Sequence, residues 1–263
     1  MYNLPKDYLS PSQIEKYLRC PKQYQFTYVD NVPIVKNENL VIGSAFAYGI
    51  QVFNQARQQT VGNEPTKDEV LKAARWKAKL EGEEMQTEMK PEEVNYIIDT
   101  ITASYFDWLK DGNDQYAVAQ AEQPVSFEID GIEIKCVPDL VKISFLDLRP
   151  TIIDYKTATR SKWSKDVIMH NLQTSLYSLA LGIKTVGIHE VKKPKMLKNG
   201  WSEVVVSEQV VDKTEHALSN AVHAVKAVAK GIHEEVFPMC DPSNNLCNAK
   251  YCSYWTMCRG LEL

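Results

Sequence analysis

Polar and apolar residues alternate along the middle of the chain, and this alternation is the pattern of β-strands with one buried face. The turn signals between these runs are Asp130-Gly131 and Asn199-Gly200, dipeptides that favour tight hairpins. We therefore predict a meander of three strands, followed later in the chain by a hairpin. The predicted strands are residues 123–129, 132–143, 151–156, 186–191 and 203–206.

Outside these runs, apolar residues recur at intervals of three or four, which indicates helices with one buried face. Ser10 or Ser12 can cap the first helix, and Pro91 suits the first turn of another. Helices, strands, a helix and further strands, in this order, predict an α/β fold with a small central mixed sheet flanked by helices. The predicted helices run from the serine cap to about Tyr28, from about Gly43 onward, and over 66–80, 91–110, 164–182 and 212–230.

The composition is ordinary for a globular protein and adds two limits. With 263 residues, of which 44% are hydrophobic and 24% charged, the chain can bury a sizeable core. No apolar run approaches membrane-spanning length, so we expect no membrane partner. The opening residues are polar and interrupted by Pro5, which argues against a secretory segment and for a cytoplasmic location.

The net charge of −4 gives no general attraction for nucleic acids, so binding them would need a local basic surface. Five lysines near the predicted hairpin supply a candidate, with Glu190 as the one acid among them, and they could follow phosphates without reading sequence. Lysines on an edge strand also block aggregation, and this alternative fits equally well. The five are Lys184, Lys192, Lys193, Lys195 and Lys198.

Charged residues stand at the ends of two strand-like runs. Asp139 follows the alternating run 132–137, and a later apolar run ends in Asp154-Tyr155-Lys156. Side chains alternate across a strand, so Asp154 and Lys156 share one face and Tyr155 points the other way. Two carboxylates that hold a divalent cation and a lysine that orients a water would suit metal-assisted phosphodiester hydrolysis. Surface strands joined by ordinary salt bridges are the alternative.

These residues resemble the motif of the PD-(D/E)xK nuclease superfamily, with Pro138-Asp139 as its first half and Asp154-Tyr155-Lys156 as its second. Downstream, Gln173 and Tyr177 match the QxxxY helix motif of the RecB-like branch. Their spacing of four residues makes them neighbours on one helical face. The resemblance implies a restriction-endonuclease-like core in which this face lies over the metal site and touches the nucleic acid.

The same resemblance implies roles for single residues. Asp139 and Asp154 would bind Mg²⁺ or Mn²⁺, helped by the main-chain carbonyl of Tyr155. Lys156 would position the attacking water, and the glutamine and tyrosine of the QxxxY motif would hold the substrate. Glu122 and Glu128 flank a predicted strand and could add an acidic ligand, although charged strand ends are common.

The cysteines supply a separate signal, because a cytosolic setting favours metal ligation or free thiols over disulfides. One cysteine near the start, Cys20, and three near the end, Cys247, Cys252 and Cys258, resemble the layout of the AddB and Cas-four iron–sulfur nucleases. This resemblance implies a [4Fe–4S] cluster that clasps the two chain ends together. Four thiolates are equally compatible with zinc.

The sequence departs from the family pattern in two places, the spacing of the C-terminal cysteines and the residue at position 47. The gap between the first two cysteines of the C-terminal trio is four residues instead of two, and Cys240 could compete with Cys247 as a ligand. Ala47 stands where this branch commonly has a metal-binding histidine, four residues after Gly43. Cys136 lies within a strand pattern, and we interpret it as a core residue.

We expect a single nuclease domain over 1–263, with a helical lobe at about 43–112, a core at about 120–232 and a cysteine tail at 240–263 joined to Cys20. The expected activity is a metal-dependent DNA exonuclease acting on single strands or free ends, in a bacterial or phage-infected cytoplasm. Recombination or CRISPR-adaptation proteins are possible partners. The alternatives are a catalytically impaired nucleic-acid-binding subunit, which Ala47 favours, and a zinc-stapled interaction protein.

Overall fold

The computed structural model describes residues 2–34, 36–59, 64–82, 85, 87, 89–161, 163–244, 246–249 and 251–260. The chain divides into two compact units. The terminal unit comprises Met1–Val35, Pro124–Cys136 and Glu215–Leu263, and the sheet unit comprises Lys36–Gln123 and Val137–Thr214. The predicted lobe, core and tail of one nuclease domain remain a prediction.

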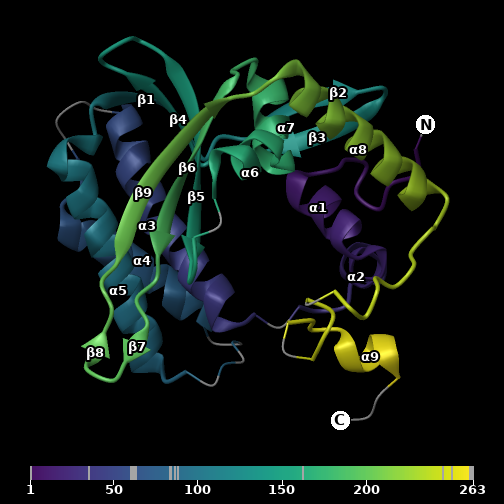
Figure 1. The fold of residues 1–263 in the computed structure, drawn as a ribbon, viewed down its shortest axis with the longest axis horizontal. Helices are drawn as coiled ribbons and strands as arrows, with labels where there is room; N and C mark the ends of the chain where they lie inside the picture. Colours follow the sequence, from purple (N-terminus) through teal and green to yellow (C-terminus); the bar gives the residue numbers. More distant parts are fainter. Residues whose placement is uncertain are drawn as a thin grey trace. The chain divides into compact units, whose positions relative to one another are not determined.

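The sheet unit contains a five-stranded mixed sheet in the order β1-β4-β5-β6-β9 (Figure 1). Strands β5 and β6 are parallel, and the other neighbours are antiparallel. With helices on both faces, the sheet confirms the predicted α/β class and its small mixed sheet. The strands are β1 (Tyr116–Ala121), β4 (Leu140–Ser144), β5 (Pro150–Ala158), β6 (Thr185–Lys192) and β9 (Val205–Asp212).

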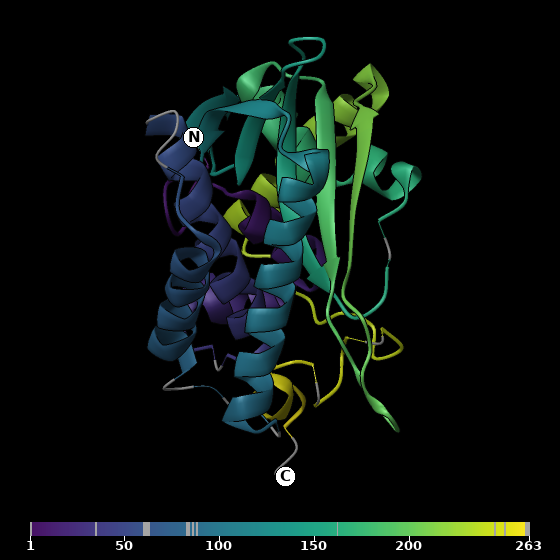
Figure 2. The same ribbon diagram turned by 90° about the vertical axis from the view of Figure 1, so that its left-hand side faces the viewer.

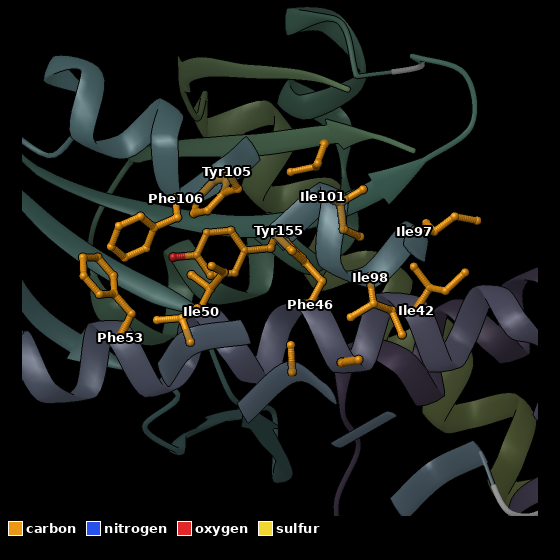
Figure 3. Close-up of a cluster of buried hydrophobic side chains, with 14 of the residues drawn as sticks. Ile42, Phe46, Ile50, Phe53, Ile97, Ile98, Ile101, Tyr105, Phe106 and Tyr155 are labelled. Atoms are coloured by element: carbon orange, nitrogen blue, oxygen red, sulfur yellow. The ribbon is translucent and has the colours of Figure 1, made fainter. Parts of the chain in front are cut away.

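Three helices cover one face of this sheet, namely α3 (Glu38–Gln59), α4 (Lys67–Gly82) and α5 (Pro91–Trp108), and a π-helical turn, η2 (Leu109–Asn113), follows α5 (Figures 1 and 2). Apolar residues of α3 recur every three or four positions and are buried against α5 and the sheet (Figure 3). They are Ile42, Phe46, Ile50 and Phe53.

Two shorter helices contact the sheet: α6 (Lys165–His170) contacts β6 and β9, and α7 (Leu172–Leu181) contacts β5 and β6. We predicted one helix over 164–182, and this was wrong because Asn171 has an extended backbone and caps α7 through its side chain. The buried Lys213 supports the break, since its ammonium donates to the carbonyl oxygens of Ile168 and Asn171 at 2.7 and 3.1 Å. These bonds add to the main-chain bonds that the same two carbonyls accept from the N–H groups of Asn171 and Ser175, and they hold the junction between α6 and α7 in place.

The terminal unit begins with α1 (Pro11–Arg19), capped by the Ser10 side chain, which accepts a hydrogen bond from the Gln13 amide. The predicted continuous helix to Tyr28 is wrong, because Pro21 cannot continue α1 and instead starts a new helix. The remaining elements of this unit are α2 (Pro21–Tyr24), the π-helix η1 (Gln25–Val29), β2 (Val125–Ile129), β3 (Ile132–Cys136), α8 (Glu215–His233) and α9 (Trp255–Arg259).

The predicted meander also needs correction. The run 132–143 splits into β3 and β4 at Pro138, and β2 and β3 form a separate two-stranded sheet. The hairpin at Asn199-Gly200 is confirmed, with β7 (Met196–Leu197) and β8 (Gly200–Trp201) at its tip. Gly200 has a φ of 112°, a left-handed conformation that favours glycine. None of the described helices is both long and apolar enough to cross a lipid bilayer.

Candidate active site

Strand register brings three acidic residues into one row. Ala121 pairs with Leu140 on the neighbouring strand, and Leu140 pairs with Ile153. Continuing each ladder by one residue places Glu122 beside Asp139, and Asp139 beside Asp154. A hydrogen bond of 3.2 Å from the Glu122 amide to the Asp139 carbonyl extends the first ladder in this way. Because neighbouring strands lie about 4.8 Å apart, the three carboxylates gather where β1 ends and β4 begins, beside the middle of β5.

The Asp139 carboxylate is fixed to the neighbouring strand. Its Oδ2 accepts a hydrogen bond of 2.6 Å from the main-chain N–H of Tyr155. Pro138 ends the preceding run, so Asp139 precedes β4 without being part of the regular ladder. The carboxylate accepts the hydrogen bond that a main-chain carbonyl of the neighbouring strand would accept in a regular sheet. Asp139 is thereby held to the peptide that joins Asp154 and Tyr155.

A second set of contacts links β5 to helix α7. The Lys156 ammonium lies 2.7 Å from Asp154 Oδ2 and donates to Gln173 Oε1 at 2.9 Å. The Gln173 amide in turn donates to the Tyr177 hydroxyl at 2.6 Å. The structure therefore joins the QxxxY pair to the lysine of the DxK motif through direct contacts, with Asp154 at the middle of β5 and Asp139 just before β4.

The alternation along β5 is as predicted. Tyr155 is buried in the core between the sheet and α3, whereas Asp154 and Lys156 lie on the opposite face, toward α7. The register also places Glu190 of β6 beside Lys156. The Glu190 side chain is buried and accepts a hydrogen bond from the Ser161 hydroxyl, so it anchors the loop that precedes α6.

Acidic charge is in excess at this site, and the pKa values respond to it. Burial raises the pKa of Asp139 well above its ordinary value, and the charges of Asp154 and Glu122 raise it further. Burial also raises the pKa of Asp154, although the charge of Lys156 partly offsets this. Burial, followed by the charge of Asp154, raises the pKa of Glu122 to about 7. Three carboxylates face one lysine, so a cation would relieve the repulsion among them.

The donor set fits a hard divalent cation. Asp154 is 1% exposed, and its Oδ1 has no hydrogen-bond partner among the described residues. Buried carboxylate oxygens are otherwise nearly always paired, and carboxylates are the ligands that Mg²⁺ and Mn²⁺ prefer. No three His, Cys, Asp or Glu side chains in the described ranges already surround a single point, so binding an ion would draw these carboxylates together.

Helix α3 packs against β5 at Thr157, three residues after Asp154. A Cβ atom added to Gly43 would lie 3.3 Å from Thr157 Oγ1, so the start of α3 packs closely against the strand that carries the motif. Ala47 lies one turn further along this helix and is partly exposed. Its methyl group cannot bind a metal, and Glu122 is the additional acid that the sheet brings to the site.

Sequence reasoning undervalued Glu122 because it did not predict β1. The segment Tyr116–Ala121 is short and carries only a weak alternation, so Glu122 could not be assigned to a strand end next to Asp139. The available signal was its position just before the turn residues Gln123-Pro124.

Three further kinds of side chain have the chemistry to contact a nucleic acid: a tryptophan that could stack on bases, a histidine, and the lysines near the hairpin. Trp163 is buried, and the Lys156 ammonium lies 5.8 Å from the centre of its ring, so it is not free to stack on bases. His170 is exposed and pairs with Asp166 at 3.8 Å. The predicted basic surface is smaller than expected, because Lys193 is buried and donates to Asn39, whereas Lys195 and Lys198 are exposed.

The terminal unit holds the cysteines. One cavity is lined by all four predicted ligands and by Cys240, so the structure gathers five thiols where four were predicted. Arg259 donates to Cys247 Sγ at 2.9 Å, and Gln23 donates to Cys252 Sγ at 3.1 Å. Cys136 is fully buried in β3, as expected of a core residue. The four predicted ligands in the cavity are Cys20, Cys247, Cys252 and Cys258.

Comparison with solved structures finds chains of similar fold and low sequence identity, among them the following three. The protein SSO0001 is 13% identical over 96% of both chains, with a TM-score of 0.39. LHK-Exo in complex with dAMP is 10% identical over 74% of this chain and 94% of its own, with a TM-score of 0.34. A phage-related exonuclease from Haemophilus somnus 129PT is 12% identical over 79% and 97%, with a TM-score of 0.31.

Comparison with curated proteins found no match. The family model of the PD-(D/E)XK nuclease superfamily matches residues 8–259, which is nearly the whole chain and includes both halves of the acidic motif. The chain therefore belongs to the PD-(D/E)XK nuclease superfamily.

Proposed function

We propose that this chain is a divalent-metal-dependent deoxyribonuclease of the exonuclease type, acting on single-stranded DNA or on free DNA ends. One observation carries the proposal: strand register gathers Glu122, Asp139 and Asp154 in a row, with Lys156 beside them. Carboxylates on adjacent strand ends with a neighbouring lysine are the donor set for metal-assisted phosphodiester hydrolysis.

The ion-binding groups would be the carboxylates of Asp139 and Asp154 and the main-chain carbonyl of Tyr155, with Glu122 as a further acidic ligand. When bound, Mg²⁺ or Mn²⁺ would act as a Lewis acid on the scissile phosphate and compensate the negative charge of the site. The acids of this chain would otherwise repel a phosphodiester, because their charge outweighs that of the one lysine.

Lys156 and helix α7 would act on the reacting groups. The ammonium is already held between Asp154 and Gln173, so its position is set before the substrate binds. From there it would orient the attacking water and balance negative charge that develops on the phosphate. Gln173, which Tyr177 fixes, would contact the backbone of the bound strand.

The experiment that tests this function is digestion of oligonucleotides labelled at either end, with Mn²⁺ or Mg²⁺ and with EDTA. We expect the wild type to release short labelled products only with the metal, and Lys156→Ala to lose this activity. The matched control is Lys72→Ala, which removes an exposed lysine of α4 that belongs neither to the carboxylate row nor to the lysines near the hairpin. Equal cleavage by the wild type and Lys156→Ala would contradict the proposal.

The same assay separates the second candidate, a nucleic-acid-binding subunit without chemistry, which Ala47 favours. That subunit would retain the labelled strand in a filter-binding assay and would leave it uncut at every metal concentration. Circular and linear single strands, each as DNA and as RNA, would define the need for an end and for deoxyribose. Recombination or CRISPR-adaptation proteins remain proposed partners.

We also propose that the thiols of the terminal unit bind a [4Fe–4S] cluster with a structural role. The support is one cavity lined by thiols from both ends of the chain, with Arg259 and Gln23 donating to sulfur, as is common around cluster ligands. Zinc is the alternative. Anaerobically purified protein should be brown, absorb near about 400 nm and contain iron and sulfide. A colourless protein that contains one zinc ion would instead show that these thiols bind zinc.

The ligand set can be determined with serine variants of the five cysteines that line this cavity. Cys20→Ser or Cys252→Ser should lower the iron content and the thermal midpoint together, because a ligand to a structural cluster also ties chain segments. Cys240→Ser should leave both unchanged if the predicted set is correct. A loss of iron in Cys240→Ser would instead place Cys240 among the ligands.

A further inference from the structure

The side chain of Tyr155 points into the core, among the apolar residues of α3 and α5 (Figure 3). Its hydroxyl accepts a hydrogen bond of 2.8 Å from the Nδ2 of Asn54, a residue of α3 that is fully buried. At the other end of the same residue, the Tyr155 N–H binds the Asp139 carboxylate. One residue thus joins α3 on the core face of β5 to an acidic group on the site face.

The side chain that donates this hydrogen bond, Asn54, also buries a polar atom that lowers the stability of the fold. The Oδ1 of Asn54 is buried and has no partner among the described residues. A buried amide oxygen without a partner destabilises a fold, and an apolar side chain of the same size would avoid this penalty. Asn54 therefore is not explained by packing alone, and its one bonded partner is the residue between Asp154 and Lys156.

A rigid set of neighbours holds the Tyr155 ring. It packs edge to face on Tyr105, with ring centroids 5.7 Å apart, and edge to face on Phe46 at 6.2 Å. The Tyr105 hydroxyl and the Nδ1 of His189 are 2.6 Å apart, and the Nε2 of His189 lies 3.0 Å from Glu208. Glu208 also forms an ion pair with Lys142.

The proton positions in this set follow from charge. Burial favours the neutral form of Glu208, but the hydrogen bond from His189 and the charge of Lys142 outweigh this and bring its pKa to about 2. The carboxylate therefore accepts, and the Nε2 of His189 carries a proton. Burial lowers the pKa of His189, so the imidazole is neutral and its Nδ1 accepts from the Tyr105 hydroxyl. Each group is therefore the donor or the acceptor of a defined hydrogen bond, and the Tyr155 ring packs against this hydrogen-bonded set.

We propose that Asn54 and Tyr155 form a positioning pair, which ties β5 to α3 and thereby fixes the peptide that orients Asp139 and the side chains of Asp154 and Lys156. The inference rests on the proposed nuclease function. The pair acts through the backbone, because the Tyr155 amide binds one candidate ligand and its carbonyl is another. Losing the tie would loosen the ion-binding geometry before it affected the binding of DNA.

The test compares Tyr155→Phe and Asn54→Leu with the wild type in two measurements, Mn²⁺ binding by calorimetry and the Mn²⁺ dependence of cleavage. Tyr155→Phe removes only a hydroxyl, and Asn54→Leu removes the donor together with the unpaired oxygen. Each variant should bind Mn²⁺ about tenfold more weakly and lower kcat by a similar factor, the range seen for residues that orient metal ligands. KM for the oligonucleotide should be unchanged.

The matched control is Tyr116→Phe. Tyr116 belongs to the same core, and its buried hydroxyl has no partner among the described residues. If Tyr155→Phe and Asn54→Leu stay within twofold of Tyr116→Phe in Mn²⁺ affinity and kcat, the positioning pair is refuted while the nuclease function stands. A wild type that neither binds Mn²⁺ nor cleaves DNA refutes the proposed function, and the pair with it. Asn54→Leu keeps the test valid if Tyr155→Phe fails to fold.

Discussion

The two faces of strand β5 follow opposite physical rules. Ile153 and Tyr155 on the core face are buried among apolar and aromatic side chains, and the one hydroxyl there has a partner. Asp154 on the other face is just as buried, yet one of its oxygens is unpaired and its charge is only partly balanced by Lys156. The core face stabilises the strand, and the site face gives up stability to hold charges that can bind a cation.

The largest effect should come from the site face. Asp154→Asn removes the charge that Lys156 and a cation share, and it leaves the volume unchanged. We expect cleavage to fall by at least about a hundredfold, because losing one charge-stabilising contact in a site costs that much. Initial rates at saturating Mn²⁺ measure this, with circular dichroism as the control for folding. Retained cleavage would mean that Asp154 has no part in the chemistry.

The next effect should come from the core face and should change stability instead of chemistry. Phe46 is 1% exposed and contacts the rings of Tyr105 and Tyr155. Phe46→Ala should lower the free energy of unfolding by about 3–5 kcal/mol through lost burial and a cavity. Urea denaturation followed by tryptophan fluorescence measures it. A loss under about 1 kcal/mol would show that this face is not the core that holds β5.

A smaller effect concerns pH. The pKa of Asp139 is raised in the folded protein, so its ionised form costs folding free energy above that pKa. The cost disappears as the pH falls through the folded pKa, so without metal the stability difference between Asp139→Asn and the wild type should shrink from pH 8 to pH 5. Asp139→Asn should be more stable than the wild type at pH 8, on the order of 1 kcal/mol.

Thermal unfolding in EDTA across this pH range checks the direction. The comparison with Asp139→Asn is needed because the lowered pKa values of Lys213 and His189 change the stability of both proteins in this range. Added Mn²⁺ should raise the midpoint of the wild type most at pH 8, where protons compete least for the carboxylates. A midpoint difference between Asp139→Asn and the wild type that grows from pH 8 to pH 5 would contradict the raised pKa.

The smallest effect tests the departure at Ala47. Ala47→His would add an imidazole at the position where the resemblance implies a metal ligand. We expect Mn²⁺ affinity to rise several-fold, because a further ligand would join the carboxylates while the other donors remain. Calorimetry measures it, with Ala47→Gln as the control for size. No change in affinity would place the start of α3 outside reach of the ion.

The two faces also differ in how far the sequence predicts them. The alternation of β5 and the spacing of Gln173 and Tyr177 are local, so their shared faces were predictable from periodicity alone. The row of carboxylates depends on pairing between strands that are distant in sequence. Glu122 reaches Asp139 only because β1 pairs with β4 across the inserted β2–β3 hairpin, which no local pattern encodes.

Breaks inside predicted elements had local causes that periodicity hides. Pro138 divides the run 132–143, and Asn171 divides the run 164–182, although apolar positions continue through both. Lys193 shows a limit of predicting exposure from charge. Its charge predicted an exposed side chain, but it is buried and donates a hydrogen bond to Asn39. The fifth thiol of the cavity, Cys240, is likewise a product of how the terminal unit folds.

The most direct test of the central claim is a crystal structure grown with Mn²⁺ and measured at a wavelength where manganese scatters anomalously. We predict one anomalous peak within about 2.3 Å of a carboxylate oxygen from both Asp139 and Asp154, close to the Tyr155 carbonyl. A peak bound by neither aspartate, or no peak at saturating Mn²⁺, would contradict the account.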